Sequence, residues 1–245
     1  MSSLTANAPN IWLPESRVGI IDGDLLCYST AFRFPEDGQV AECYKAMDSF
    51  VVYLRDLLEL DDFTIYLSGN SNFRKELVKT YKANRRPEAK PLNLQACKDY
   101  LRSGWAAKIV EGYEADDLLG IRHTEENENT LVMSYDKDMK QLEGWHFDWR
   151  NWVMEYVDRQ QADYNLVLQT LTGDTVDNVK GIYRCGPVKA SKILGDTKGF
   201  YPMMEKALAA YYEAGLGFKD FEDNYRCLKI LRTPEQEWPE LEELR

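Results

Sequence analysis

Histidine and paired cysteines are scarce in this chain, and their scarcity removes two classes of chemistry. Only two histidines occur among the 245 residues, His123 and His146, and neither lies beside a serine or cysteine in a setting typical of a nucleophilic triad. The five cysteines lie far apart and form no Cys-x-x-Cys pair, the usual signature of a zinc or dithiol redox site. We expect the histidines to be structural and the cysteines to be reduced thiols.

Long apolar runs are also missing. No stretch approaches the roughly 20 apolar residues of a membrane-spanning helix. Residues 1–10 lack the basic and apolar segments of a signal peptide. We therefore expect a soluble protein with no membrane partner, located in the cytoplasm, which is the host cytoplasm if a phage encodes it.

Positive charge is scarce overall but concentrated in one segment. The chain has 30 Lys and Arg against 41 Asp and Glu, a net charge of −11. This balance argues against a nucleic-acid partner, because affinity for a polyanion comes from Lys and Arg at its phosphates. Seven basic residues nevertheless lie between Arg74 and Lys90, against two acids, Glu76 and Glu88. A local basic surface therefore remains available.

Strand-like apolar segments alternate with helical patterns in the first part of the chain. Strands are expected at residues 17–21, 63–67, 107–110 and 130–133, helices at 41–60, 92–103 and 114–122, and extra strands or a hairpin at 145–148 and 152–157. Later helices are expected at 161–171, 187–194, 199–214 and 218–231. The pattern predicts an α/β core with a mainly parallel sheet over residues 1–158 and a helical region over 159–245. The acidic end, from Glu235, is expected to be solvated.

Eight carboxylates lie in positions that ordinary surface charge explains poorly. Most follow directly after predicted strands, and the last two lie three residues apart: Asp22, Glu114, Asp116, Asp117, Asp136, Asp138, Asp174 and Asp177. The carboxyl ends of parallel strands meet at one edge of a sheet, so these acids are expected to converge there. An oxygen-only ligand set suits Mg²⁺ or Mn²⁺, and two such ions can hydrolyse a phosphodiester in line.

Two further segments suit a nucleic acid. The first interleaves aromatic and basic residues, with Phe73 and Tyr81 available for base stacking and Arg74, Lys82, Arg85 and Arg86 for phosphates. The second has glycines on both sides of a turn before Pro187, where backbone N–H groups can bind a phosphate beside Lys180, Arg184, Lys189 and Lys192. A solvated charged loop and a purely structural helix-turn-helix are the respective alternatives.

Taken together, six segments resemble the flap endonuclease family, and most closely the bacteriophage 5′-3′ exonucleases. The resemblance covers about residues 18–194 and depends on the order and spacing of Ile21-Asp22-Gly23-Asp24, Asn72-Phe73-Arg74-Lys75, Tyr81-Lys82-Ala83-Asn84-Arg85, Glu114-Ala115-Asp116-Asp117, Asp136-Lys137-Asp138 and Gly173-Asp174-Thr175-Val176-Asp177-Asn178-Val179-Lys180-Gly181-Ile182. It implies a PIN-like (resolvase-type) core, a helical arch at about residues 70–103, and a helix-three-turn-helix at about residues 161–195.

The resemblance also implies roles for the acids. Asp22, Asp116 and Asp136 would hold one divalent ion. Asp116, Asp136, Asp138 and Asp174 would hold or share a second ion. Glu114, Asp117 and Asp177 would act directly or through water.

The basic segments receive roles from the same resemblance. Lys82, with Arg74 and Arg85 nearby, would orient the scissile phosphate. The turn segment would bind duplex DNA, with K⁺ as a candidate further ion, through Lys180, Gly181, Ile182, Arg184, Gly186, Val188, Lys189 and Lys192.

The implied function is a metal-dependent 5′ nuclease that removes nucleotides from DNA 5′ ends and cuts 5′ flaps or the RNA of RNA–DNA hybrids. A PIN-type ribonuclease and a catalytically silent DNA-junction binder are the alternatives. The acidic end is also a candidate contact for a replication protein.

One departure from the family pattern concerns the segment after the second strand: many relatives carry an aspartate there, where this chain has Ser68-Gly69-Asn70. Gly69→Asp is therefore expected to tighten divalent binding.

Overall fold

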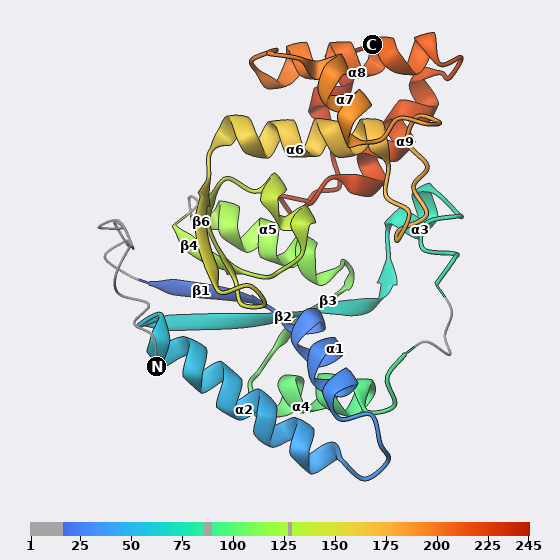
Figure 1. Cartoon of the computed structure of the whole chain (residues 1–245). Coiled ribbons are helices and arrows are strands. Elements are labelled where there is room, and N and C mark those ends of the chain that lie inside the picture. Colours follow the sequence, from blue (N-terminus) through green and yellow to red (C-terminus); the bar gives the residue numbers. More distant parts are fainter. Residues whose placement is uncertain (1–16, 86–89, 127–128) are drawn as a thin grey trace.

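The computed structural model describes residues 17–85, 90–126 and 129–245. Its centre is a six-stranded sheet in the order β3-β2-β1-β4-β5-β6, in which all neighbouring strands are parallel except β5 and β6 (Figure 1). The strands are β1 (Val18–Asp22), β2 (Asp62–Asn72), β3 (Lys108–Gly112), β4 (Thr130–Met133), β5 (Gly144–Asp148) and β6 (Val153–Val157). The expected α/β fold with a mainly parallel sheet is confirmed, and the extra strands form an antiparallel hairpin.

Each face of the sheet has its own helices, because successive side chains of a strand point to opposite faces. Ile21 packs in one buried cluster with Leu26 and Met47, whereas Ile20 packs in another with Leu119. The first face is covered by α1 (Gly23–Arg33), α2 (Val40–Leu57) and α4 (Leu94–Gly104), and the second by α5 (Ala115–Glu125) (Figure 1). A short 3₁₀ helix, η2 (Lys137–Gln141), follows β4.

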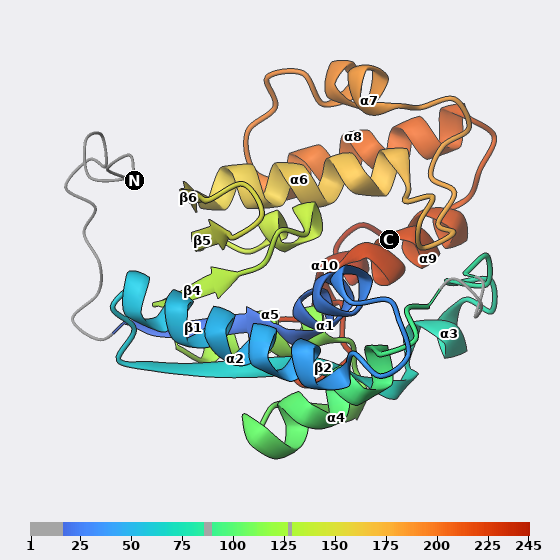
Figure 2. The same ribbon diagram turned by 60° about the horizontal axis from the view of Figure 1, so that its bottom comes forward.

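The helical region forms a second core beside the second face. Leu166, Ala190, Tyr211 and Phe221 are buried together in it. Figure 2 shows α6 running alongside α8, with α7 beyond them on the side away from the sheet. Its helices are α6 (Arg159–Thr172), α7 (Pro187–Leu194), α8 (Phe200–Glu213) and α9 (Phe218–Leu228). All four were expected from the sequence pattern.

Among the described residues, the α-helices that were not expected are α1, α3 (Arg74–Leu77) and α10 (Pro239–Glu242). Helix α10 corrects the expectation of a solvated acidic end. Glu240 and Leu241 are buried, and the Glu240 carboxylate forms an ion pair with Lys229. Glu235 and Glu237 remain exposed. The end of the chain therefore packs against α9 in part.

The expected arch at residues 70–103 contains the end of β2, α3, turns up to residue 85, and α4. Arg86 lies outside the described residues, as do residues 1–10, for which a signal peptide was not expected. Within the described part of the chain, no helix is both long and apolar enough to cross a bilayer.

Candidate active site

Asp22 occupies the end of β1 and caps the N-terminus of α1. Its carboxylate accepts hydrogen bonds from the Leu25 backbone N–H (3.1 Å) and the Ser134 hydroxyl (3.1 Å). Burial, together with the negative charges of Asp24 and Asp136, raises the pKa of Asp22 to about 7. The carboxylate is thus held in a fixed orientation at a place where negative charge is unfavourable.

Asp116 and Asp136 bring further negative charge to the same sheet edge. Asp116 lies in the first turn of α5, where burial and the charges of Asp117 and Glu114 raise its pKa well above the ordinary value. Asp136 precedes η2 and donates its backbone N–H to the Ser134 hydroxyl oxygen (3.1 Å), the same hydroxyl that bonds the carboxylate on β1. A hard cation with oxygen ligands would relieve this concentration of charge.

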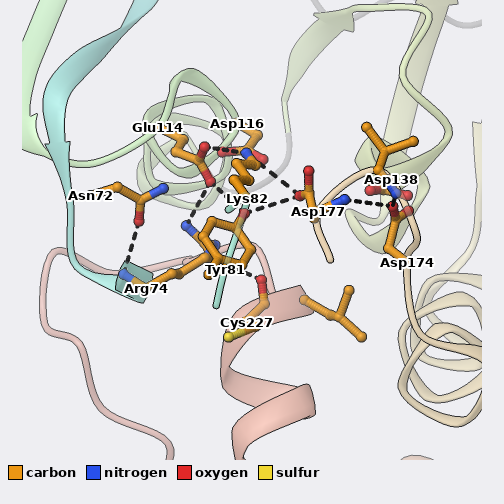
Figure 3. A network of polar contacts seen from close by, with 12 residues as sticks. Asn72, Arg74, Tyr81, Lys82, Glu114, Asp116, Asp138, Asp174, Asp177 and Cys227 are labelled. Carbon is orange, nitrogen blue, oxygen red and sulfur yellow. Dashed lines mark hydrogen bonds and ion pairs between the residues drawn. The ribbon is translucent and has the colours of Figure 1, made fainter. Parts of the chain in front are cut away.

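Asp138 and Asp174 face each other at one side of this group of acids (Figure 3). The Lys137 ammonium donates to both, at 2.9 Å to each carboxylate. The second oxygen of Asp174 accepts from the backbone N–H groups of Val176 (2.8 Å) and Asp177 (3.1 Å). Lys137 therefore joins η2, which follows β4, to the loop before α7.

The two glycines that flank this loop explain its sequence. Gly173 and Gly181 both have positive φ, 71° and 60°. A Cβ on Gly173 would lie 2.4 Å from the Val179 carbonyl oxygen, and one on Gly181 would lie 2.3 Å from the Gly173 nitrogen. Since neither position has room for a side chain, the loop closes tightly and fixes Asp174.

Lys82 and Tyr81 connect the basic segment to the acids (Figure 3). The Lys82 ammonium forms an ion pair with Glu114 and lies 3.5 Å from Asp177, while the Tyr81 hydroxyl lies 2.7 Å and 3.0 Å from the same two carboxylates. Arg85 pairs with Asp177 at 2.7 Å. Despite burial, the Lys82 charge lowers the pKa of Glu114 to about 2.

The eight acids do not form one continuous cage in this arrangement. Among the described residues, no group of three acidic, histidine or cysteine side chains is placed so that it could hold a metal ion. The outer acids are bridged instead by Lys82 and Lys137. The carboxylate oxygens of these acids are ligands that suit a hard divalent ion. The distances between the carboxylates, however, suit the ammonium groups of Lys82 and Lys137 that bridge them.

A family model described as the N-terminal resolvase-like domain of 5′-3′ exonucleases matches residues 17–167, from β1 into α6. The chain belongs to this family.

Relatives with nuclease and polymerase names resemble this exonuclease-family chain over most of its length. Flap endonuclease Xni of Shewanella baltica is 26% identical over 190 residues, which is 71% of this chain and 72% of the relative. The 5′-3′ exonuclease of Buchnera aphidicola is 27% identical over 197 residues, 71% of this chain and 68% of the relative. A thermostable DNA polymerase I of Thermus thermophilus is 28% identical over 202 residues, 74% of this chain but only 24% of the polymerase.

Solved structures share the fold. The zinc-bound 5′-exonuclease of bacteriophage T5 aligns with a TM-score of 0.66 at 18% identity, covering 87% of this chain and 89% of that protein. The T5 D15 flap endonuclease in complex with DNA and metal ions aligns with a TM-score of 0.62 at 17% identity, covering 86% and 90%. The resemblance inferred from the sequence is confirmed at the level of family and fold.

Arg74 has a different role from the one expected. It is 1% exposed, and all its side-chain donors are used, by Asp117, Glu114 and the carbonyl oxygens of Cys227 and Lys229. Because no N–H group remains for a phosphate, the expectation that Arg74 reaches the scissile group or binds DNA is contradicted. Asp117, with no exposed surface, serves as its partner, which argues against a place near a metal ion.

The expected base-stacking rings are also inside the protein. Phe73 is buried against Tyr113 and Trp238, and Tyr81 is buried with Val179 in another cluster. Neither ring offers a face to a nucleobase, so the stacking expectation is contradicted for both. Aromatic residues between lysines and arginines indicated exposure in the sequence, but here they anchor the basic segment.

The surroundings of Gly69 argue against the expectation that Gly69→Asp would tighten divalent binding. A Cβ at this position would lie 2.8 Å from the Val110 carbonyl oxygen and 3.2 Å from the Glu111 carboxylate. A side chain here would therefore point toward β3 and another acid, and it would need the backbone to shift. Gly69→Asp is not expected to complete a metal site in this fold.

The turn before α7 forms an exposed basic surface. Lys180, Arg184, Lys189 and Lys192 are all exposed. Gly186 caps α7 with open space around its Cβ position, and Val188 is 74% exposed. Ile182 is instead buried in the helical core, so only its backbone can face a ligand. The sequence reading missed the exposed Tyr183 in the same turn, although an aromatic residue between Ile182 and Arg184 was a signal for it.

A second feature that the sequence reading missed is an aromatic cavity of about 530 Å³ beside Asp136. The Arg150 guanidinium lies 5.5 Å from the ring centre of Tyr135, which immediately precedes Asp136. The side chains that characterise the cavity are Tyr28, Phe32, Arg33, Tyr135, Trp149 and Arg150. Most of them come from α1 and the β5–β6 turn, and they converge only in the folded chain.

Proposed function

We propose that this protein is a divalent-metal-dependent 5′ nuclease that hydrolyses DNA phosphodiesters, as a 5′-3′ exonuclease and a 5′-flap endonuclease. One observation carries the proposal. The buried acids at the carboxyl end of the sheet lie directly beside a loop, residues 173–181, that leads into an exposed basic turn and α7. A duplex held at the turn would therefore end at the acids.

The acids would hold two Mg²⁺ or Mn²⁺ ions. Asp22, Asp116 and Asp136 suit the first ion, and Asp138 and Asp174 suit the second, with Glu114 and Asp177 acting through water. Bound there, the ions would supply a hydroxide nucleophile and stabilise the leaving oxygen. Ser134 contributes by orienting Asp22, to which its hydroxyl donates at 3.1 Å.

Lys82 suits a role at the scissile phosphate. Its ammonium lies among carboxylates and its side chain is 12% exposed, so water is largely excluded around it. An ammonium in such surroundings stabilises negative charge on a phosphate oxygen more strongly than one in water. Arg85, which is half exposed on the same segment, suits an adjacent phosphate.

The basic turn suits the backbone of duplex DNA. The N-terminus of α7 presents the positive end of the helix dipole, with Lys189 in its first turn. We propose that residues 161–195 act as a helix-three-turn-helix, with K⁺ as a candidate ion at the turn. The aromatic cavity, with two arginines, suits a nucleotide next to the cleavage point.

The RNA strand of an RNA–DNA hybrid is a further proposed substrate, since catalysis at a phosphodiester by this site needs no group specific to deoxyribose. Glu235, Glu237, Glu242 and Glu243 are exposed and form the part of the acidic end that we propose as a contact for a replication protein.

The deciding experiment compares flap, nicked, blunt and hybrid substrates, labelled at the 5′ or 3′ end, with Mg²⁺ and with EDTA. We expect Mg²⁺-dependent release of short 5′ products and cutting near the base of the flap. Preferential cleavage of single-stranded RNA would indicate a PIN-type ribonuclease instead. Duplex binding without cleavage, in Mg²⁺ and in Mn²⁺, would indicate a silent junction binder.

A further inference from the structure

Lys137 is the one residue of the Asp136-Lys137-Asp138 segment that brings positive charge to the acids. Its ammonium lies 2.9 Å from the Asp138 Oδ1 atom and 2.9 Å from the Asp174 Oδ2 atom. The two acids belong to separate parts of the chain, the start of η2 and the loop that follows α6. One cation therefore joins two carboxylates that would otherwise repel each other.

The ammonium occupies the space that a divalent ion would need. Mg²⁺ binds carboxylate oxygens at about 2.0–2.1 Å. A lysine ammonium group cannot lie among the ligands of the same ion, because the two positive charges repel each other. The second oxygen of Asp174 is already engaged by the backbone N–H groups of Val176 and Asp177. The oxygen left for a metal ion is the one that Lys137 uses.

Lys137 is also free to leave, which distinguishes it from Lys82. The Lys137 side chain is 71% exposed, whereas that of Lys82 is 12% exposed. A largely exposed lysine can rotate its ammonium into water, and this movement leaves the carboxylates of Asp138 and Asp174, which are 23% and 8% exposed, without their counter-ion. Withdrawal of Lys82 would require opening its buried contacts with Glu114 and Asp177.

We propose that Lys137 is an internal counter-ion that holds Asp138 and Asp174 in position in the metal-free protein and is displaced when a divalent ion binds between them. This inference rests on the proposed function, because it assigns these two acids to the second ion. Lys137 is then a positioning residue: it lowers the affinity for that ion and keeps the 173–178 loop aligned before the ion arrives.

The test is Lys137→Met, which keeps the length of the side chain and removes its charge. Ca²⁺ binding to the full-length protein is measured by calorimetry, without DNA and without turnover. We expect the weaker of the two bound ions to bind about tenfold more tightly, since a positive charge within a few ångströms has been removed. Lys137→Arg keeps the charge and should bind Ca²⁺ like the unchanged protein.

Lys140→Met is the matched control. Lys140 lies on the same short helix but pairs with Glu155 at 2.7 Å, away from the acids. Its removal should leave the Ca²⁺ affinity within about twofold of the unchanged protein, because the contribution of an exposed pair is local.

Thermal unfolding gives a second readout. In EDTA, Lys137→Met should melt about 1–3 °C lower, because the two carboxylates lose their counter-ion. With saturating Ca²⁺ it should gain more stability than the unchanged protein, since tighter binding to the folded state raises the melting temperature. Equal or weaker Ca²⁺ binding by the Met variant would overturn the proposal. A lack of DNA cleavage by the unchanged protein would refute the proposed function without altering this titration.

Discussion

Arg74 and Asp117 form a buried pair in which two guanidinium nitrogens lie 2.6 Å and 2.7 Å from the two carboxylate oxygens. Arg74 also donates to the Cys227 and Lys229 carbonyl oxygens, and Asp117 accepts from the Leu231 backbone N–H. The pair therefore connects three parts of the chain: α3, α5, and the end of α9.

Arg74→Leu should destabilise the protein by about 3–5 kcal/mol, because it leaves the buried Asp117 carboxylate without its counter-ion and two carbonyl oxygens without their Arg74 donors. Arg74→Lys should recover only part of this stability, since an ammonium cannot reproduce the two-pronged contact. Urea unfolding measures both, with Lys75→Ala, on the same helix but exposed, as the control. A loss of activity at full stability would instead indicate a catalytic Arg74.

Asp136→Ala and Asp116→Ala should abolish cleavage while duplex binding remains within about threefold. Each removes an oxygen ligand worth several kcal/mol at the transition state, which corresponds to a rate loss of about 10³-fold or more. Single-turnover cleavage and fluorescence anisotropy in Ca²⁺ measure the two quantities. Asp56→Ala, at an exposed site on α2, is the control. Mg²⁺-dependent turnover in either variant would contradict the assigned mechanism.

Asp22 should make the metal-free protein less stable as the pH rises toward 7. Its pKa is raised to about 7, so between its ordinary value and pH 7 the folded state binds more protons than the unfolded state. Stability falls with pH wherever this holds.

Asp22→Asn should therefore be more stable than the unchanged protein in EDTA at pH 8, and the difference should vanish near pH 4. Melting temperatures across this range check it. With saturating Mg²⁺ the order should reverse, because the ion requires the charge. A pH-independent difference in EDTA would show that the carboxylate of Asp22 is not strained by its surroundings.

The strands and most helices could be predicted because their apolar periodicity is local. The acids at strand ends could be found because parallel strands align their carboxyl ends at one edge. Helix α1 escaped prediction because its sequence, from Gly23 to Arg33, mixes Cys, Ser and Thr, which favour helices only weakly. Its helical state depends on packing between the sheet and α4.

The roles of the basic residues could not be predicted, because charge in a sequence does not show burial. Arg74 lies inside and Lys75 outside, although they are neighbours. The role of Lys137 could not be predicted, because Lys137 lies between two acids and its second partner, Asp174, is distant in sequence. The roles of Arg74 and Lys137 both depend on partners that are distant in sequence, and only the fold brings these partners together.

Gly69→Asp should destabilise the protein and leave metal binding unchanged. Its Cβ would approach the Val110 carbonyl oxygen to 2.8 Å, and the added carboxylate would lie near Glu111. We expect a loss of about 1–3 kcal/mol from the forced shift alone. Gly69→Ala separates this steric effect from the added charge. Tighter Ca²⁺ binding by the Asp variant than by the Ala variant would restore the idea of a missing ligand.

Lys189→Ala should weaken duplex binding without affecting the metal site. Lys189 is exposed in the first turn of α7, where it can bind a phosphate of the duplex. Removing one lysine–phosphate interaction should lower the slope of log affinity against log salt by about 1, uniformly across sequences. Anisotropy titrations of a nicked duplex in Ca²⁺, at several KCl concentrations, measure this slope. Lys219→Ala, an exposed lysine on α9 that pairs with Asp223, is the matched control and should leave the slope unchanged. If Lys219→Ala lowers the slope and Lys189→Ala does not, the duplex lies on a different face of the helical region, whereas a change confined to Lys189→Ala places the DNA backbone at the turn before α7.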